Sequence, residues 1–146
     1  MGDRELRAVC IERMNTAETV YLTTIGADGY PHTRAVLNLR NREEYLEQAR
    51  LYADHDDDFM VLLVTNTCSR KRTEIEANPK IGVYYCHPKA SFGLSLIGEV
   101  EIADDLALKQ AVWCEGWERY FPTGRPDDPD FTLLRLFPTE ARGWNG

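Results

Sequence analysis

The hydrophobic pattern of this chain predicts short β-strands, because apolar and β-branched residues recur in short runs bounded by Gly, Pro, Asn and Asp. We expect strands over 20–25, 30–39, 59–65, 81–86, 92–102, 131–137 and 141–144. The 26–29 segment tolerates positive φ and makes the first two strands a hairpin, with Pro31 at the start of the second strand or on an edge. Gly93 and Gly98 indicate bulges or a close backbone approach within their strand.

Three amphipathic or helix-favouring segments interrupt the strands. They are expected over 3–14, 69–78 and 104–117. The second helix must end before Pro79, because proline disfavours helical geometry in the residue that precedes it. Asp104 or Asp105 is the expected cap of the third helix. Residues 41–58 are polar and partly helical, and 121–130 form a loop rich in Pro, Gly and Asp.

The predicted elements favour a mainly β fold with peripheral α-helices: an antiparallel barrel of six to seven strands. The 146 residues, 43% of them apolar, suffice for one ordinary core. We therefore expect a single domain over 1–146, with an N-terminal helix over 1–15 and the barrel with its inserted helices over 16–146.

Charge and cysteine spacing exclude several classes of protein. The net charge of −7 argues against a surface made for nucleic acid or a membrane, since phosphate binding needs clustered Lys and Arg. The four cysteines lie far apart, so we interpret them as reduced thiols and expect no metal site. The acidic run 54–58 is interpreted as an exposed turn. Charged residues interrupt the apolar positions near the N terminus, so we expect a cytoplasmic protein without a signal peptide or membrane span.

A basic turn after the strand at 59–65 carries the clearest chemistry. Ser69, Arg70 and Lys71 begin a helix, where cations face the positive end of the helix dipole unless an anion is present. A phosphate would accept hydrogen bonds from the free N–H groups and from Ser69. A solvated basic turn explains the same residues equally well. Arg34 is a second candidate, because a half-buried guanidinium in an apolar strand needs an anionic partner, although alone it fits a solvent-facing position.

These segments resemble the pyridoxamine 5′-phosphate oxidase-like flavoproteins, and within them the general stress protein 26 group. The similarity to the wider family rests on 34–37, 64–71, 74–79, 97–101 and 138–146. The similarity to the general stress protein 26 group rests on Trp113, Trp117, 120–124 and 127–135. These motifs cover nearly all of the chain after the first predicted helix.

The resemblance implies a split barrel whose homodimer binds FMN at the subunit interface. It implies that Arg34, Ser69, Arg70 and Lys71 hold the phosphate. The isoalloxazine would be flanked by backbone groups of Ala35, Val36, Leu37, Val64 and Thr65. Trp144 of the partner subunit would approach it. The aromatic residues near 113–121 either border the flavin or are core residues, and the core interpretation is favoured.

The departures from the family pattern bear on activity. True pyridoxamine phosphate oxidases have a lysine where this chain has Leu39, a glutamine near Gly93, and an arginine-x-histidine segment after the last tryptophan. We therefore expect an FMN-dependent oxidoreductase of the general stress protein 26 type that acts on an unidentified small acceptor, and not a true pyridoxamine phosphate oxidase. No catalytic residue is assigned, because no triad follows from the dispersed histidines. The alternative is a non-catalytic module that stores or senses flavin, or that binds haem or F420.

Overall fold

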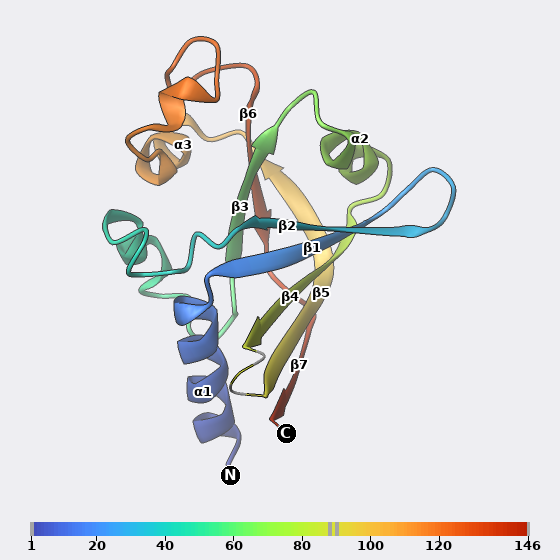
Figure 1. Ribbon diagram of the computed structural model, residues 1–146, viewed down its shortest axis with the longest axis vertical. Coiled ribbons are helices and arrows are strands. Elements are labelled where there is room, and N and C mark those ends of the chain that lie inside the picture. The colour runs from blue at the N-terminus through green and yellow to red at the C-terminus, as the bar shows by residue number, and fades with distance from the viewer. Residues whose placement is uncertain (1, 88, 90, 146) are drawn as a thin grey trace.

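The computed structural model describes residues 2–87, 89 and 91–145, and a seven-stranded antiparallel sheet forms its body (Figure 1). The strands are β1 (Thr19–Ile25), β2 (Pro31–Leu37), β3 (Val61–Asn66), β4 (Lys80–His87), β5 (Phe92–Ala103), β6 (Phe131–Leu136) and β7 (Glu140–Asn145). The α-helices are α1 (Asp3–Thr16), α2 (Arg70–Ala77) and α3 (Leu106–Val112), and the 3₁₀ helices include η1 (Glu47–Tyr52) and η3 (Trp117–Arg119). The predicted strands and helices are therefore present in the predicted order.

The sheet curls because one long strand joins its two parts. The strand order is β2-β1-β4-β5-β6-β3, and β7 also pairs with β5. The first part of β5 pairs with β4 and β7, whereas its last residues pair with β6. The two ends of this order, β2 and β3, lie in contact. The predicted mainly β split barrel, antiparallel and with peripheral helices, is confirmed.

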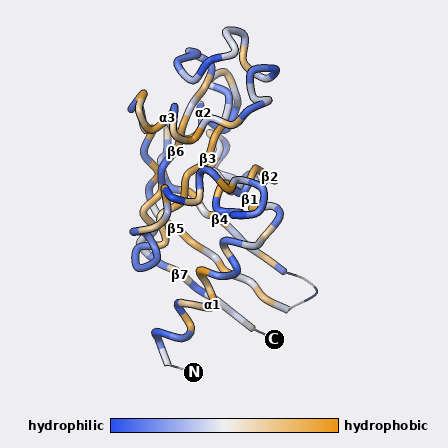
Figure 2. Tube along the Cα trace, turned by 90° about the vertical axis from the view of Figure 1, so that its left-hand side faces the viewer, coloured by the Kyte–Doolittle hydropathy of each residue, from blue (hydrophilic) through white to orange (hydrophobic). Residues whose placement is uncertain are grey.

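Two hydrophobic clusters fill the molecule. The first lies between α1 and the sheet and includes Met14, Val20, Leu22, Tyr85, Leu94, Leu96 and Leu136. The second lies beneath α3 and η3 and includes Leu39, Tyr52, Leu62, Trp117, Phe121, Phe131 and Leu133. Figure 2 shows hydrophobic residues along the strands in the middle of the molecule and many hydrophilic residues on the loops at its upper end. The core positions alternate along β1 and β4, whereas consecutive residues are buried in β3 and β6.

The predicted helix over 104–117 is wrong in length. Asp105 does cap it, since its carboxylate accepts a hydrogen bond from the N–H of Ala107 at 2.9 Å. However, α3 ends at Val112, because Trp113 leaves the helical conformation with a ψ of 132°, and the chain then turns through Gly116, whose φ is 97°. A right-handed helix cannot pass through that left-handed conformation. Gly116 inside the predicted helix was the signal against it.

Two strand boundaries also differ from the prediction. β3 begins at Val61 and not at Phe59, because Phe59 has a positive φ of 57° that strand geometry excludes. β2 ends at Leu37, and Leu39 turns into the second cluster. The expected close approach at Gly98 is confirmed: a Cβ there would lie 3.3 Å from the Pro138 backbone. Among the described residues, no helix is long and apolar enough to cross a membrane.

Candidate functional site

The basic turn between β3 and α2 is held by side chains on both sides. Ser69 is the N-cap of α2, and its hydroxyl accepts a hydrogen bond from the Arg72 N–H at 3.3 Å. The Ser69 hydroxyl also lies 3.0 Å from that of Thr65 at the end of β3. The carboxylate of Asp130 accepts hydrogen bonds from the Asn66 amide at 2.7 Å and from the Cys68 N–H at 3.3 Å. These hydrogen bonds hold the turn and the start of α2 in one conformation.

A buried carboxylate, Glu74, lies at the centre of the charged residues. It is only 6% exposed, and one of its oxygens accepts a hydrogen bond from Thr24 on β1. Its other oxygen accepts a 2.8 Å bond from Nε of Arg70, and Nη2 of Arg34 lies 3.6 Å from Oε2. The Thr24 hydrogen bond is the largest cause that lowers the pKa of Glu74, and Arg70 adds to it. Glu74 is therefore an ionised carboxylate that links β1, β2 and α2.

Arg34 has an anionic partner within the protein, the carboxylate of Glu74, whereas the sequence had suggested a phosphate. Its Nη1 donates to the Thr24 hydroxyl at 2.7 Å and to the His32 carbonyl at 2.9 Å. The side chain is 25% exposed, so it lies at the edge of the core and reaches solvent. These hydrogen bonds fix the orientation of Arg34, and part of its guanidinium remains accessible to solvent.

Lys71 lies beside Arg34 and has no counter-ion of its own among the described residues. Partial burial and, next, the charge of Arg34 lower the pKa of Lys71. Across the part of the chain that the structure describes, no carboxylate lies within 4.0 Å of its ammonium nitrogen. Arg34 and Arg70 pair with the carboxylate of Glu74, and Asp28 approaches Arg70 through His32. With Lys71 there are three cations for two carboxylates, so the corner between β2 and α2 is positively charged. Such a corner suits an anion.

A cavity of about 500 Å³ lies at the ends of β2 and β3, and its lining does not include Arg34, Arg70 or Lys71. Three of the predicted flavin-flanking residues line it: Leu37, Val64 and Thr65. Its other lining residues include the aromatic Tyr45, Trp117, Tyr120 and Phe121 and the charged Glu44, Glu115 and Arg119. Thr65 belongs to both features, because it lines the cavity and contacts Ser69. A ligand with an anionic end and a planar apolar end would fit both.

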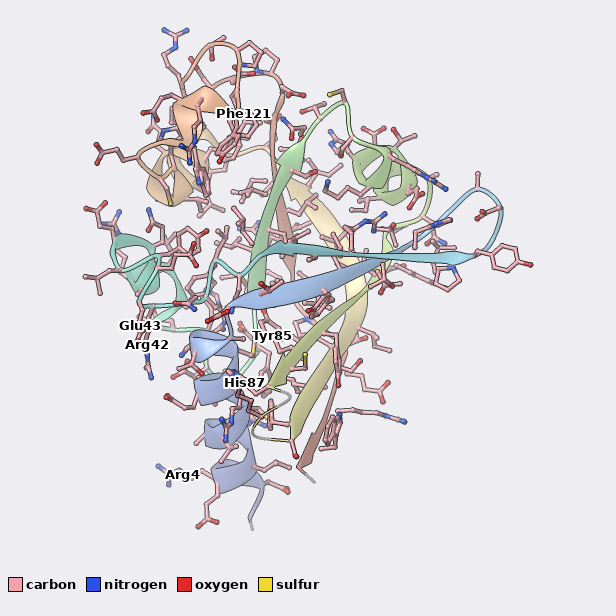
Figure 3. All side chains as sticks on the ribbon, viewed as in Figure 1. Arg4, Arg42, Glu43, Tyr85, His87 and Phe121 are labelled. Atoms are coloured by element: carbon pink, nitrogen blue, oxygen red, sulfur yellow. The ribbon has the colours of Figure 1, made fainter. Side chains whose placement is uncertain are left out.

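The aromatic residues of the 113–121 segment are mainly core residues, as the favoured interpretation has it. Trp113 lies edge-on to Phe131 with ring centroids 5.3 Å apart, and Trp117 and Phe121 are buried in the same cluster. Tyr120 is exposed. Figure 3 labels Phe121 on the segment beside α3, at the upper end of the molecule. The core residues Trp117 and Phe121 nevertheless form part of the cavity wall.

Three predicted site residues lie outside the positive corner and the cavity. Val36 packs against the first hydrophobic cluster, and Ala35 faces away from it, opposite Tyr21 of β1. Trp144 lies on β7, which runs to the opposite end of the molecule from α2 (Figure 1). Its indole N–H donates to the Tyr84 hydroxyl at 3.2 Å, and the residue is 51% exposed. Within one chain, Trp144 is not part of the cavity wall.

Glu74 and Thr24 were not among the site residues expected from the sequence. Glu74 follows Arg70 by one helical turn, and that spacing is a signal for an ion pair. No sequence signal places Thr24 against Glu74. His32 was also overlooked: its Nε2 lies 3.1 Å from an Asp28 oxygen and 3.3 Å from Nη2 of Arg70.

The acidic run 54–58 makes local contacts instead of gathering around one point. His55 Nδ1 lies 2.9 Å from an Asp58 oxygen, and Asp58 also accepts the Met60 N–H at 3.0 Å. No group of three His, Cys, Asp or Glu side chains that could hold a metal occurs in the described ranges. All four cysteines are free.

Comparisons with known proteins agree with this architecture. The family model described as pyridoxamine 5′-phosphate oxidase matches residues 6–145. A Clostridium acetobutylicum structure described as related to general stress protein 26 is 28% identical, with a TM-score of 0.75 and coverage of 99% of this chain and 91% of that one. No curated protein matches.

Two further solved structures share the fold at lower identity. The general stress protein 26 of Bacillus anthracis is 21% identical, with a TM-score of 0.71 and coverage of 95% and 93% of the two chains. A Nostoc punctiforme protein described as pyridoxamine 5′-phosphate oxidase-related and FMN binding is 16% identical, with a TM-score of 0.68 and coverage of 99% and 86%. Because the family model spans nearly the whole chain, this protein belongs to the pyridoxamine 5′-phosphate oxidase family.

Proposed function

We propose that this protein binds FMN, with the phosphate at the positive corner and the flavin ring in the adjoining cavity. The observation that carries the proposal is Lys71, a partly buried cation beside Arg34 that lacks a carboxylate partner among the described residues. A phosphate would supply the missing negative charge and accept hydrogen bonds from Ser69 and from the N terminus of α2. One protein of this fold is itself described as FMN binding.

The cavity supports the second half of the proposal. Its volume of about 500 Å³ is within the usual size of a small-molecule site. Leu37 and Val64 would provide an apolar wall, and the backbones of Leu37, Val64 and Thr65 would provide hydrogen bonds to the ring edge. FMN would supply two-electron redox chemistry when bound, and the protein would supply binding, orientation and exclusion of water. We propose an oxidoreductase of the general stress protein 26 type with a small-molecule acceptor.

Two positions argue against pyridoxamine phosphate oxidase activity itself. Leu39, which stands where those enzymes have a lysine, is buried in the second hydrophobic cluster. A charged side chain at that position would lie in the core. Gly93 is covered by the indole of Trp144, because a Cβ on Gly93 would lie 2.0 Å from Nε1 of Trp144. These positions serve packing in this chain, which leaves no vitamin-binding group there.

We further propose a homodimer through the outer face of the sheet. Tyr21, Ile97 and Trp144 are exposed on this face, and a shallow cavity of about 890 Å³ runs along it past Gly82 and Ile97. Monomers rarely keep several large apolar side chains exposed on one face of a sheet. A second copy would cover them through a two-fold interface and would bring Trp144 of the partner subunit toward the flavin.

Light scattering on purified protein tests the dimer. Twice the chain mass of 16.7 kDa is expected for the wild type, and Ile97→Arg should shift the protein toward a single chain because it places a charge in the interface. The exposed Glu5→Gln, on α1, is the control and should remain dimeric. A wild type that stays monomeric at micromolar concentration would contradict this part of the proposal.

Titration of cofactor-stripped protein with FMN and with riboflavin tests the cofactor. We expect FMN to bind at micromolar or lower concentration and riboflavin, which lacks the phosphate, at least about tenfold more weakly. Addition of NADH or NADPH without oxygen then tests activity, and loss of the flavin band near ~450 nm would support an oxidoreductase. Binding without reduction would favour storage or sensing. If the protein does not bind FMN, a Soret band would assign haem as its cofactor, and absorption near ~420 nm would assign F420.

A further inference from the structure

We propose that Glu74 is a positioning residue that holds Arg34 and Arg70 in the arrangement that receives a phosphate. This inference rests on the proposed function. Glu74 itself would not touch the ligand, because both of its oxygens already accept hydrogen bonds or ion pairs from protein groups. Its effect would be exerted through the two guanidinium groups.

The contacts of Glu74 differ from those of an ordinary helical ion pair. Pairs one turn apart on an exposed helix contribute little, because water competes for both charges. Glu74 is almost fully buried, and it contacts Arg34 from β2 and Thr24 from β1 as well as Arg70 from its own helix. The carboxylate therefore joins three elements, and leaving it without these donors would be costly.

The second argument comes from Arg34 and Thr24. Thr24 donates its only hydroxyl proton to Glu74 and accepts a hydrogen bond from Nη1 of Arg34 at 2.7 Å. The direction of the Thr24 hydroxyl is therefore set by Glu74, and this leaves its lone pairs for Arg34. Arg34 is positioned twice, once through Thr24 and once by the 3.6 Å ion pair. Without Glu74, the Thr24 hydroxyl would lose the acceptor that sets its direction.

The third argument is electrostatic. Arg34, Arg70 and Lys71 are like charges in one corner, and the buried carboxylate of Glu74, which pairs with two of them, reduces their mutual repulsion before any ligand arrives. With Asp28, which approaches Arg70 through His32, three cations and two carboxylates leave one positive charge, which favours an anionic ligand. Glu74 thus keeps the empty corner assembled and leaves it positive enough to bind an anion.

Glu74→Gln tests the inference, because glutamine keeps the size and removes the charge. The amide can accept only through one oxygen, and its NH2 group would face the donors of Arg34 or Thr24. We expect the affinity for FMN to fall about tenfold, which is the effect of one charge-assisted hydrogen bond, while the affinity for riboflavin stays unchanged. Glu76→Gln is the matched control: it lies on the same helix, is exposed and pairs with Arg72 instead.

The ratio of FMN affinity to riboflavin affinity separates a positioning role from a structural one. General loosening of the fold would weaken both ligands together. If wild-type protein does not prefer FMN to riboflavin, the proposed function fails. If the wild type prefers FMN but Glu74→Gln keeps the same ratio as Glu76→Gln, only the positioning inference is overturned.

Thr24→Val provides a second test if Glu74→Gln does not fold. Valine has nearly the shape of threonine but breaks the link between Glu74 and Arg34. We expect the same selective loss of FMN affinity, smaller than in Glu74→Gln, because the direct ion pair between Arg34 and Glu74 would remain. An unchanged ratio of FMN to riboflavin affinity in a folded Thr24→Val protein would also overturn the inference.

Discussion

Two regions of the molecule each hold a guanidinium in apolar surroundings, and they satisfy it in different ways. Arg40, in the loop after β2, is only 3% exposed. It donates to the carbonyls of Met60 and His55 at 2.9 Å each and lies over the ring of Tyr52 at 4.7 Å. Arg34, within β2, is more exposed and is paired with a carboxylate. The donors of Arg40 are thus used within the protein, and its role is to hold the chain.

The comparison shows which cations can serve a ligand. Burial lowers the pKa of Arg40, and the nearby tyrosines and aspartates oppose that effect. The groups around Arg40 therefore stabilise the charge of this one side chain. The positive corner instead contains an excess of cations over carboxylates and opens beside a cavity. A cation whose donors are all satisfied stabilises the fold, whereas a surplus of cations at a cavity indicates an anionic ligand.

Arg40→Met should give the largest effect and should act on stability alone. Its removal leaves the Met60 and His55 carbonyls without their donor, so we expect the free energy of unfolding to fall by about 3 kcal/mol. Urea denaturation of the flavin-free protein measures this. The ratio of FMN affinity to riboflavin affinity, measured on the folded protein, should stay at the wild-type value. A selective loss of FMN affinity would show that Arg40 also belongs to the FMN site.

Lys71→Ala should weaken FMN binding without lowering stability. We expect FMN binding to weaken by about 2 kcal/mol, because the variant removes the cation that lacks a carboxylate partner, whereas riboflavin binding should not change. The free energy of unfolding should stay the same or rise slightly, since repulsion from Arg34 is relieved. Isothermal titration with both flavins, beside urea denaturation, checks both parts. Unchanged FMN affinity would remove Lys71 from the phosphate site.

Ser69→Ala should affect both properties modestly. The variant removes the N-cap of α2, which costs about 1 kcal/mol of unfolding free energy. It also removes one hydroxyl from the proposed phosphate site. Ser69→Thr is the control, because threonine also caps helices. If Ser69→Ala lowers stability without any change in FMN affinity, the serine belongs to the structural region alone.

The smallest expected effect is a pH dependence of stability due to Glu74. Its pKa is lowered from the ordinary value of 4.5, first by Thr24 and then by Arg70, so the folded state favours the ionised form. The resulting stabilisation is complete above pH 4.5 and is lost as pH falls through the lowered pKa. The melting temperatures of wild type and Glu74→Gln should therefore differ most above pH 4.5 and converge in more acidic solution. A constant difference across this range would contradict an ionised Glu74.

Much of the fold follows from local patterns. The hairpin at 26–29, Pro31 at the first position of β2 and Ser69 at the cap of α2 depend on residues within a few positions of one another. The helix over 104–117 failed for a local reason too, since Gly116 was given too little weight. Arg34 and the basic turn were identified by their misplaced charge.

What the sequence by itself determined is the set of strands, the capped helices and a surplus of cations around residues 70–71. What only the tertiary structure decided is which groups those cations meet. Thr24 and Glu74 are separated by 50 positions, and they meet because β1 packs against α2. The cavity likewise joins the ends of β2 and β3 to the η3 segment. Long-range packing, which no local period reports, selects the partner of a buried charge and the shape of a cavity.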